Sequence, residues 1–369
     1  MNAVVVAARR TPVGTAGRSL ASVDVARLAA PVLRAVVDDL GVSPDTVDEV
    51  ILGNCMGPGG NPARVAALAA GLGTAVPGLT VDRQCGSGLE AINLASALIA
   101  AGAGTLVLAG GAESASTAPL RFLPGDPPVR YQRAPFAPAE YGDPDMGEAA
   151  ETVTAEAGID RQRQDRYAAR SHATASAADF SRELVPLAGL DRDERPRRGL
   201  TAARLARLPA AFAQGGTVTA GNSCGISDGA AAVAVVGERL RVANGWPGLR
   251  VLAWQICGTD PRRPGVGLVP AVRAVLARHD LGPRDLGAVE ITEAFAGQVL
   301  ACVDALGLDE GVVCAEGGAL ALGHPWGASG AILMVRLFSR MVSADGPRFG
   351  LAACAVGGGM GVATLVERT

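Results

Sequence analysis

Two stretches of this chain alternate apolar segments with amphipathic helical segments, and this alternation constrains the fold more than any other feature. It runs from residue 1 to about 118 and returns at about residue 221. Buried strands that alternate with helices are typical of α/β proteins, so we predict an α/β fold. In the first stretch we expect strands at Val4–Ala8, Val47–Leu52 and Thr105–Ala109 and helices at Asp24–Leu40 and Pro62–Ala70. In the second we expect strands at Ala230–Val236, Leu249–Cys257, Ala288–Thr292, Gly350–Ala355 and Val362–Glu367 and helices at Val269–His279, Ala294–Leu306 and from the His324 turn to Met341.

The region between these stretches loses the pattern. Pro119–Pro144 is rich in Pro, Gly, Arg and aromatic residues, and Asp191–Arg198 is a charged loop. Helices are expected at Arg161–Arg182 and Leu200–Phe212. We interpret the region as an insertion on the α/β core, and such insertions often form substrate-binding lids. The predicted divisions are an N-terminal α/β half at 1–118, an inserted substrate-binding region at 119–220, the end of the N-terminal half at 221–248, and a C-terminal α/β half at 249–369.

The two alternating stretches look like an internal duplication. A turn at Cys85 leads into a helix and then a strand that ends at Gly110-Gly111. A turn at His324 likewise leads into a helix and a strand that ends at Gly357-Gly358. The match is one of pattern, with little identity. It predicts that Cys85 and His324 lie at equivalent helix starts and face each other across a pseudo-two-fold axis.

Cys85 lies between a short extended segment, Pro77–Val81, and a helical pattern that ends near Gly102. A helix N-terminus favours a thiolate, so we expect a lowered pKa and a nucleophilic role. The alternative is a buried and inert thiol, which is the usual environment of a free cysteine. This segment alone leaves both interpretations open.

Composition excludes several classes of function. The chain has 369 residues, of which 49% are apolar, and a net charge of −3, so we expect a large core and neither a nucleic-acid surface nor a membrane partner. Met1–Ala8 lacks a basic leader and is expected to be a buried strand, so we predict a cytoplasmic protein. The seven cysteines form no C-x-x-C pair, and we expect neither disulfides nor a metal site. The glycines at 357–361 lead into a strand, which argues against a dinucleotide cofactor.

Four motifs in order carry a resemblance to a known family. They are Cys85-Gly86-Ser87-Gly88, Thr292-Glu293-Ala294-Phe295, Gly323-His324-Pro325 and Gly357-Gly358-Gly359-Met360-Gly361. Together they resemble the thiolase family over essentially the whole chain. The resemblance implies a duplicated thiolase fold with five layers, αβαβα. It also implies a coenzyme A thioester as substrate with no bound cofactor, and a homodimer or homotetramer with Pro119–Pro144 as a contact between dimers.

The resemblance also implies roles for individual residues. Cys85 takes the position of the cysteine that is acylated by an acyl-CoA, and His324 that of the histidine that activates it. The acyl group would then move in a Claisen-type condensation, or the reverse thiolysis would run. His172 and His279 lie on or beside predicted helices and are most simply structural.

Two motifs depart from the family pattern. Thr292 replaces an asparagine of the oxyanion hole, and loss of one such donor can cost ~10²–10³ in rate. Glu293 and Phe295 remain and are interpreted as structural. The acid/base cysteine of the family falls at Ala355, beside Cys354. A one-residue shift turns a strand side chain to the opposite face unless a bulge restores it, so Cys354 is either the acid/base or a buried core thiol.

Smaller departures lie near the expected substrate site. Cys224 replaces a serine that contacts pantetheine, Asp145 replaces the histidine before Met146, and Trp326 replaces a smaller residue. Trp326 would narrow the acyl pocket or serve as a core aromatic. We expect substrate contacts from Met146, Cys224, Trp326 and Gly358.

Three functional hypotheses follow. The leading one is a thiolase-family acyltransferase that uses Cys85, His324, Cys354 and Thr292. The second is an acyltransferase or decarboxylating condensing enzyme that needs no second cysteine and uses an amine, an alcohol or a malonyl-type thioester as acceptor. The third is a non-catalytic thiolase-like partner protein, in which Cys85 would not be acylated.

Overall fold

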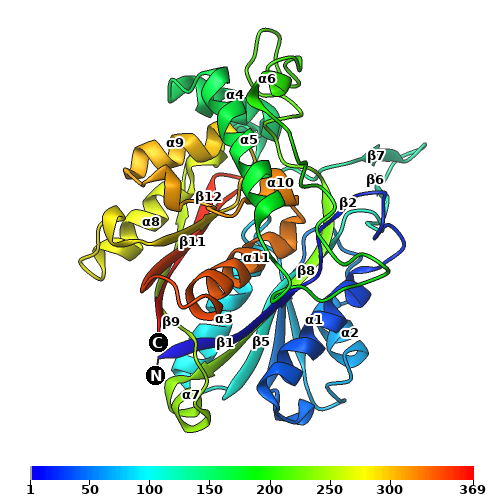
Figure 1. Cartoon of the computed structure of the whole chain (residues 1–369). Helices are drawn as coiled ribbons and strands as arrows, with labels where there is room; N and C mark the ends of the chain where they lie inside the picture. The colour runs from blue at the N-terminus through cyan, green and yellow to red at the C-terminus, as the bar shows by residue number, and fades with distance from the viewer. Residues whose placement is uncertain (1) are drawn as a thin grey trace.

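The computed structural model describes residues 2–369. Its N-terminal half comprises β1 (Ala3–Arg10), β2 (Gly14–Thr15), α1 (Val25–Leu40), β3 (Glu49–Gly53), α2 (Pro62–Ala69), β4 (Gly78–Val81), α3 (Ser87–Ala101) and β5 (Leu106–Ser114). An insertion follows with β6 (Arg121–Leu123), β7 (Val129–Tyr131), α4 (Met146–Glu156), α5 (Arg161–Ala177) and α6 (Ala202–Leu205), before β8 (Ser227–Gly237) and α7 (Glu238–Asn244). The C-terminal half comprises β9 (Leu249–Gly258), α8 (Leu268–Ala277), β10 (Ala288–Ile291), α9 (Ala296–Leu306), α10 (Ala319–Leu322), α11 (Trp326–Phe338), β11 (Phe349–Val356) and β12 (Met360–Arg368) (Figure 1).

Strand pairing repeats in the two halves. In the N-terminal half β3 runs parallel to β5, and β5, β8 and β1 are antiparallel neighbours in that order. In the C-terminal half β10 runs parallel to β11, and β11, β12 and β9 are antiparallel neighbours. β4 pairs with β3, and Val313 forms a single bridge to Val289 at the corresponding place. In the described part of the chain, the two half-sheets are joined only where the first residues of β9 pair with β1.

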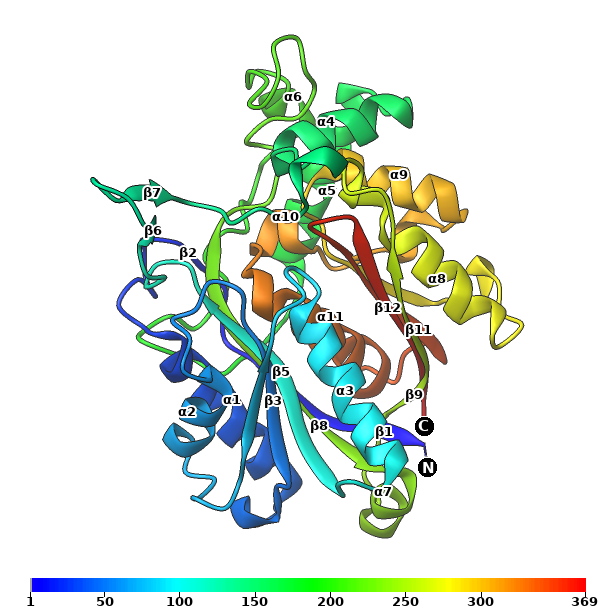
Figure 2. The same cartoon turned by 180° about the vertical axis from the view of Figure 1, so that it is seen from behind.

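Alternate residues along each strand face different layers of helices. Val4 and Val6 of β1 pack in the cluster formed with α1 and α2, while Val5 packs in the cluster formed with α3 and α11. A third cluster joins β10, β11 and β12 to α8 and α9. Helices α3 and α11 therefore lie between the two half-sheets (Figure 1 and, from behind, Figure 2). This is the five-layer αβαβα arrangement that the sequence predicted.

Glycines bring the first turns of the two central helices into contact. A Cβ added at Gly88 of α3 would lie 2.8 Å from the carbonyl oxygen of Gly327 on α11. One added at Gly330 would meet the backbone of Leu89. Because only hydrogen fits at these points, the helix starts pack backbone against backbone. Cys85 and His324 each come two residues before their helix, so the packing places both at one end of the central layer.

Local signals explain most helix ends. Most departures from the predicted elements lie in the insertion, although α7 and α10 outside it were not predicted either. Asp24 accepts from the Arg27 N–H at 2.9 Å and caps α1, which begins at Val25. Helix α5 stops at Ala177, five residues before the predicted end, because the Asp179 side chain accepts from the Ser181 N–H and begins a turn. Helix α6 spans only Ala202–Leu205, since Pro209 follows closely. Helix α4 and the β6–β7 hairpin were not predicted. No helix among residues 2–369 is long and apolar enough to cross a membrane.

Candidate active site

Cys85 is half-buried in the turn before α3. The next residue, Gly86, packs against Val356 near the end of β11. Burial is the largest influence on the pKa of the Cys85 thiol and raises it to about 11, although the backbone N–H groups of Cys85 and Gly357 favour the thiolate. The expected lowering of this pKa by the helix N-terminus is therefore wrong, because loss of hydration outweighs the helix dipole. Cys85 is a neutral thiol at pH 7 and needs a base to become a nucleophile.

His324 is buried two residues before α11. Its Nδ1 lies 2.6 Å from the Ser329 hydroxyl, while Nε2 is buried without a hydrogen-bond partner among the described residues. Burial lowers the pKa of His324 to about 4, so the ring is neutral at pH 7. When Nδ1 carries the hydrogen and donates to Ser329, Nε2 is left with a free lone pair. The ring can then accept a proton at Nε2.

A short backbone segment at residues 222–227 connects the His324 turn to the loop after β10. The Cys224 N–H donates to the Ala294 carbonyl at 2.9 Å, and the His324 N–H donates to the Gly225 carbonyl at 3.1 Å. Ser223 also forms an antiparallel bridge with Phe295. Cys224 is half-buried between these two contacts. The structure thus brings Cys224 and His324, which are far apart in the sequence, into one backbone network.

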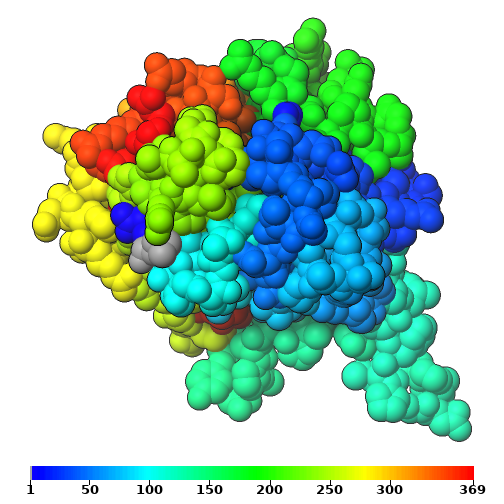
Figure 3. Space-filling view, turned by 90° about the horizontal axis from the view of Figure 1, so that it is seen from below, coloured from blue at the N-terminus to red at the C-terminus, as the bar shows by residue number. Residues whose placement is uncertain are grey.

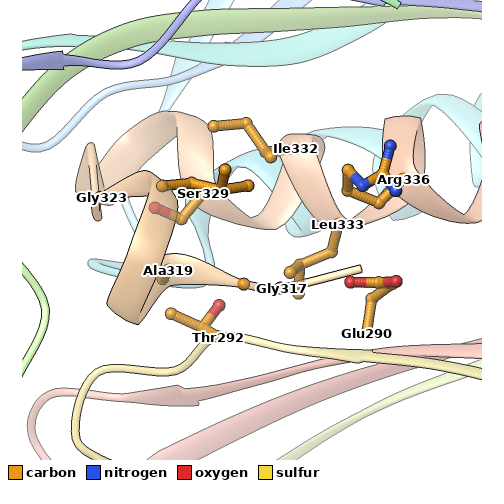
Figure 4. A pocket seen from close by; sticks show the side chains of 11 residues that line it. Glu290, Thr292, Gly317, Ala319, Gly323, Ser329, Ile332, Leu333 and Arg336 are labelled. Carbon is orange, nitrogen blue, oxygen red and sulfur yellow. The ribbon is translucent and has the colours of Figure 1, made fainter. Parts of the chain in front are cut away.

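Thr292 and Cys354 form a buried pair between β10 and β11. The Thr292 hydroxyl donates to the Cys354 sulfur at 3.3 Å, and both side chains are excluded from solvent. Figure 4 shows the hydroxyl groups of Thr292 and Ser329 facing one cavity between β10 and α11. This cavity measures about 20 Å³, which suits one water molecule and excludes an acyl chain. The structure therefore does not place Thr292 at an open substrate pocket.

Cys354 and Ala355 face opposite sides of β11. Cys354 packs with Val356 and Val362 in the cluster around α3 and α11, whereas Ala355 packs toward the outer layer and is partly exposed. Burial raises the pKa of Cys354 to about 12. β11 and β12 pair in unbroken register through Cys354, so no bulge turns the thiol toward Ala355's side. Burial suits a core thiol, but the pKa of Cys354 also responds to Cys85, and Cys354 shares its side of β11 with Val356, which contacts Gly86. The acid/base role of Cys354 therefore stays a prediction.

We expect Cys354→Ala to leave acylation of Cys85 within about threefold of the wild type and to lower the free energy of unfolding by roughly 1–2 kcal/mol, the usual cost of a small buried deletion. Turnover should persist if the Cys354 thiol only packs in the core and holds the Thr292 hydroxyl. Steady-state turnover, acyl-enzyme mass and urea unfolding measure the three quantities. Loss of turnover with intact acylation would instead establish Cys354 as the acid/base. Cys302→Ala, a buried thiol on α9, is the matched control.

The predicted substrate contacts lie at element ends. Met146 and Trp326 are the first residues of α4 and α11, and both are half-buried. Gly358 has a φ of +83°, which favours glycine, and a Cβ there would lie 2.8 Å from the Phe136 carbonyl oxygen. The Phe136 ring packs on Gly357, so the insertion covers the glycine turn beside Cys85. Sequence analysis missed Phe136, since its segment has no periodic pattern.

Two further residues support the site. Glu113 is buried at the end of β5 and accepts from the backbone N–H groups of Cys55, Met56 and Gly327 at 3.0 Å, so it joins the Cys55 loop to the start of α11. Burial raises the pKa of Glu113. Ser329 orients the His324 ring. The sequence could have indicated this contact, because Ser329 lies on the first turn of the helix that follows His324. No group of three His, Cys, Asp or Glu side chains within residues 2–369 could hold a metal ion.

Glu293, His172 and His279, which the sequence indicated as structural, form hydrogen bonds with residues outside the Cys85 and His324 turns. Glu293 accepts from the Tyr167 and Ser171 hydroxyls at 2.9 and 2.8 Å. His172 accepts from the Arg197 N–H, and His279 contacts the Leu252 carbonyl.

A half-buried thiol beside backbone donors, and a neutral histidine with a free nitrogen, suit covalent acyl transfer. The family model of the thiolase N-terminal domain matches residues 3–239, and that of the thiolase C-terminal domain matches residues 246–368. This chain belongs to the thiolase family. It is therefore an acyltransferase whose family chemistry is Claisen-type condensation or the reverse thiolysis, with an acyl-CoA substrate.

Similar thiolase-family proteins match along their full lengths. YhfS of Bacillus subtilis, named as a candidate acetyl-CoA C-acetyltransferase, is 44% identical over 374 residues, with 100% of this chain and 99% of YhfS covered. The acetyl-CoA acetyltransferase of Cupriavidus necator is 41% identical over 390 residues, with 99% of both chains covered. The crystal structure of the Bacillus anthracis acetyl-CoA acetyltransferase has a TM-score of 0.93 and 37% identity, with 100% of this chain and 99% of that chain covered. These matches agree with the duplicated thiolase fold.

Proposed function

We propose that this protein takes a short acyl group from coenzyme A onto Cys85, with His324 as base, and passes it to a carbon nucleophile. The observation that carries the proposal is the neutral His324 ring, whose Nε2 is buried and unpartnered while Nδ1 contacts Ser329. A base with that free nitrogen complements a thiol whose pKa is about 11. The acetyl-CoA names of the relatives support a short acyl chain.

In the first step His324 Nε2 takes the proton of the Cys85 thiol, and the sulfur attacks the thioester carbonyl carbon. The N–H groups of Cys85 and Gly357 favour negative charge at this position and suit the oxyanion that forms. The carbon–sulfur bond to coenzyme A then breaks, and the departing sulfur takes the proton from His324. In the second step His324 Nε2 takes the α-proton of a second acyl thioester, and the resulting carbanion forms a carbon–carbon bond with the acyl carbon. The bond from that carbon to Cys85 breaks, and the departing Cys85 thiolate takes the proton back from His324. Thiolysis is the same sequence in reverse.

A second candidate function is favoured by Ala355. The resemblance puts the acid/base cysteine at this position, and alanine can neither donate nor accept a proton. A malonyl-type donor would supply the carbanion by losing carbon dioxide, and an amine or alcohol acceptor needs no carbanion. Product analysis after mixing acylated enzyme with acetyl-CoA, malonyl-CoA or an amine distinguishes these acceptors. Condensation with acetyl-CoA alone would remove the second candidate.

Intact mass spectrometry with a panel of acyl-CoAs tests the proposed function directly. We expect one added acyl mass per chain, strongest for short acyl groups, and peptide mapping should place it at Cys85. Free coenzyme A should appear in equal amount. Absence of any adduct across the panel would contradict the proposal and favour a non-catalytic partner protein.

We also infer a homodimer, with a homotetramer as the larger assembly. Strand β4 pairs with β3 alone among the described strands, and Leu79 on it is 44% exposed. The neighbouring helix α3 lies open on the face seen in Figure 2, with Leu94 and Leu98 half-buried. The β6–β7 hairpin, with Phe122 51% exposed, lies in the blue-green segment that projects in Figure 3 and suits a contact between dimers.

Light scattering should give a mass of two or four chains. Leu79→Glu should shift it toward one chain, because a charge on an edge strand opposes strand pairing. Val242→Glu, on an exposed face of α7, is the matched control and should leave the mass unchanged. A wild-type mass of one chain over a wide range of concentrations would remove this inference.

A further inference from the structure

Arg195 lies in the charged loop of the insertion, and its guanidinium forms no ion pair within residues 2–369, although Glu194 attracts it at longer range. The side chain is half-buried, and its Nε is buried without a hydrogen-bond partner. Across residues 2–369, no acidic side chain forms an ion pair with it. The neighbouring Glu194 is engaged elsewhere, since it accepts from the Thr15 N–H at 2.7 Å and the Ser19 hydroxyl at 2.5 Å. A partly desolvated cation without an anion is costly unless a ligand supplies one.

The guanidinium of Arg195 lies directly on Gly225. A Cβ added at Gly225 would overlap the guanidinium carbon, so the glycine makes this approach possible. The Gly225 carbonyl accepts from the His324 N–H at 3.1 Å and from the Ser227 hydroxyl at 2.8 Å. Arg195 therefore contacts the residue that follows Cys224 in the chain and that accepts a hydrogen bond from the His324 backbone.

Both sides of Arg195 are fixed to the core. Asp193 accepts from the Val13 N–H at 2.8 Å and forms a buried ion pair with Arg10. The Arg197 N–H donates to His172 Nδ1 at 3.3 Å. The loop is thus anchored two residues before and two residues after Arg195.

The electrostatics agree with this geometry. Burial lowers the pKa of Arg195, and Arg197 adds to that lowering, but a guanidinium remains charged at neutral pH. The pKa of Cys224, raised to about 12 chiefly by burial, responds to both Cys85 and Arg195. Cys224 therefore lies within the electrostatic range of the nucleophile and of the unpaired cation.

We propose that Arg195 binds a carboxylate at the far end of the acyl chain and so selects short dicarboxylic acyl thioesters. The inference rests on the proposed acyl transfer to Cys85. A guanidinium matches a carboxylate with two parallel hydrogen bonds. The acyl chain stays bonded beside Cys85, whereas the phosphates of coenzyme A lie beyond the length of pantetheine.

Acylation of Cys85 by succinyl-CoA and by butyryl-CoA tests the proposal, because both acyl chains have four carbons and only one carries a carboxylate. We expect wild-type kcat/KM to favour succinyl-CoA. Arg195→Gln should lower kcat/KM for succinyl-CoA by about 10–100-fold, the worth of a charge-assisted hydrogen bond, with butyryl-CoA within about threefold. Arg195→Lys should restore part of the preference. Arg192→Gln removes an equal charge from an exposed site in the same loop and should change neither rate.

Other outcomes overturn the proposal. A wild-type preference for butyryl-CoA would contradict it even if the Arg195 variants failed to fold. In another outcome, Arg195→Gln lowers kcat/KM equally for succinyl-CoA and butyryl-CoA but leaves kcat/KM for acyl-pantetheine substrates unchanged. That result would assign Arg195 to the phosphates of coenzyme A instead. Butyryl transfer without a succinyl preference would leave the proposed function intact and remove only this inference. Failure of every acyl-CoA to acylate Cys85 would instead remove the proposed function.

Discussion

Cys85→Ala is expected to abolish covalent acylation by every acyl-CoA, with no adduct above background in the intact mass. The physical reason is that Cys85 combines partial exposure with backbone N–H groups, its own and that of Gly357, that favour negative charge at its sulfur. The other buried thiols lack access to substrate. Cys85→Ser should also show almost no adduct, because a serine hydroxyl is far harder to ionise than a thiol.

The informative controls are the other half-buried thiols. Cys55 lies close to the same turn, with its sulfur 3.2 Å from the Gln84 carbonyl, and burial raises its pKa well above the ordinary value. Cys257 on β9 is half-buried and packs toward the outer cluster with α8 and α9. Cys55→Ala and Cys257→Ala should therefore both retain the adduct. If Cys85→Ala keeps an acyl mass that maps to Cys55 or Cys224, the nucleophile has been assigned to the wrong residue.

The architecture could be predicted because its signals are local and repeated. Apolar strand patterns and helical spacing marked most elements of the two halves within a few residues. The duplication was visible as a pattern, and strand pairing supports it down to the Val289–Val313 bridge. The insertion could not be predicted equally well. Its ends depend on side chain to backbone contacts, such as that of Asp179, and on packing against distant loops.

The site shows the same division between local and tertiary information. Motifs placed Cys85 and His324, and the packing of Gly88 on α11 explains why helix starts so far apart in sequence come together. The acidity of Cys85 was predicted wrongly, because helix dipole arguments need only sequence whereas desolvation depends on the folded surroundings. Neither the Thr292–Cys354 contact nor the exposure of Ala355 follows from spacing alone, since strand facing depends on register.

His324→Ala is expected to slow acylation of Cys85 by ~10²–10⁴-fold, the usual contribution of a positioned base, while the protein still folds. With a thiol pKa of about 11, only a small fraction of Cys85 is thiolate at pH 7, so His324 must remove the proton as the thioester is attacked. Since the pKa of His324 is about 4, the ring is unprotonated across the neutral range and is available to take that proton as the new carbon–sulfur bond forms. Wild-type acylation should thus be nearly independent of pH between about 6 and 9. In His324→Ala the rate should instead rise with pH, because hydroxide then governs the thiolate fraction.

Ser329→Ala separates orientation of the ring from its basicity. It removes the 2.6 Å contact at Nδ1 and keeps the imidazole, so we expect a smaller loss than in His324→Ala and the same flat pH profile. Alkylation by iodoacetamide adds a readout that needs no acyl-CoA, and its rate should climb with pH toward about 11 in the wild type. A plateau below pH 8 would mean that Cys85 and His324 already form an ion pair in the free enzyme. In that case His324 would act by stabilising a thiolate that exists before substrate binds, and removing the histidine would raise the pKa of Cys85.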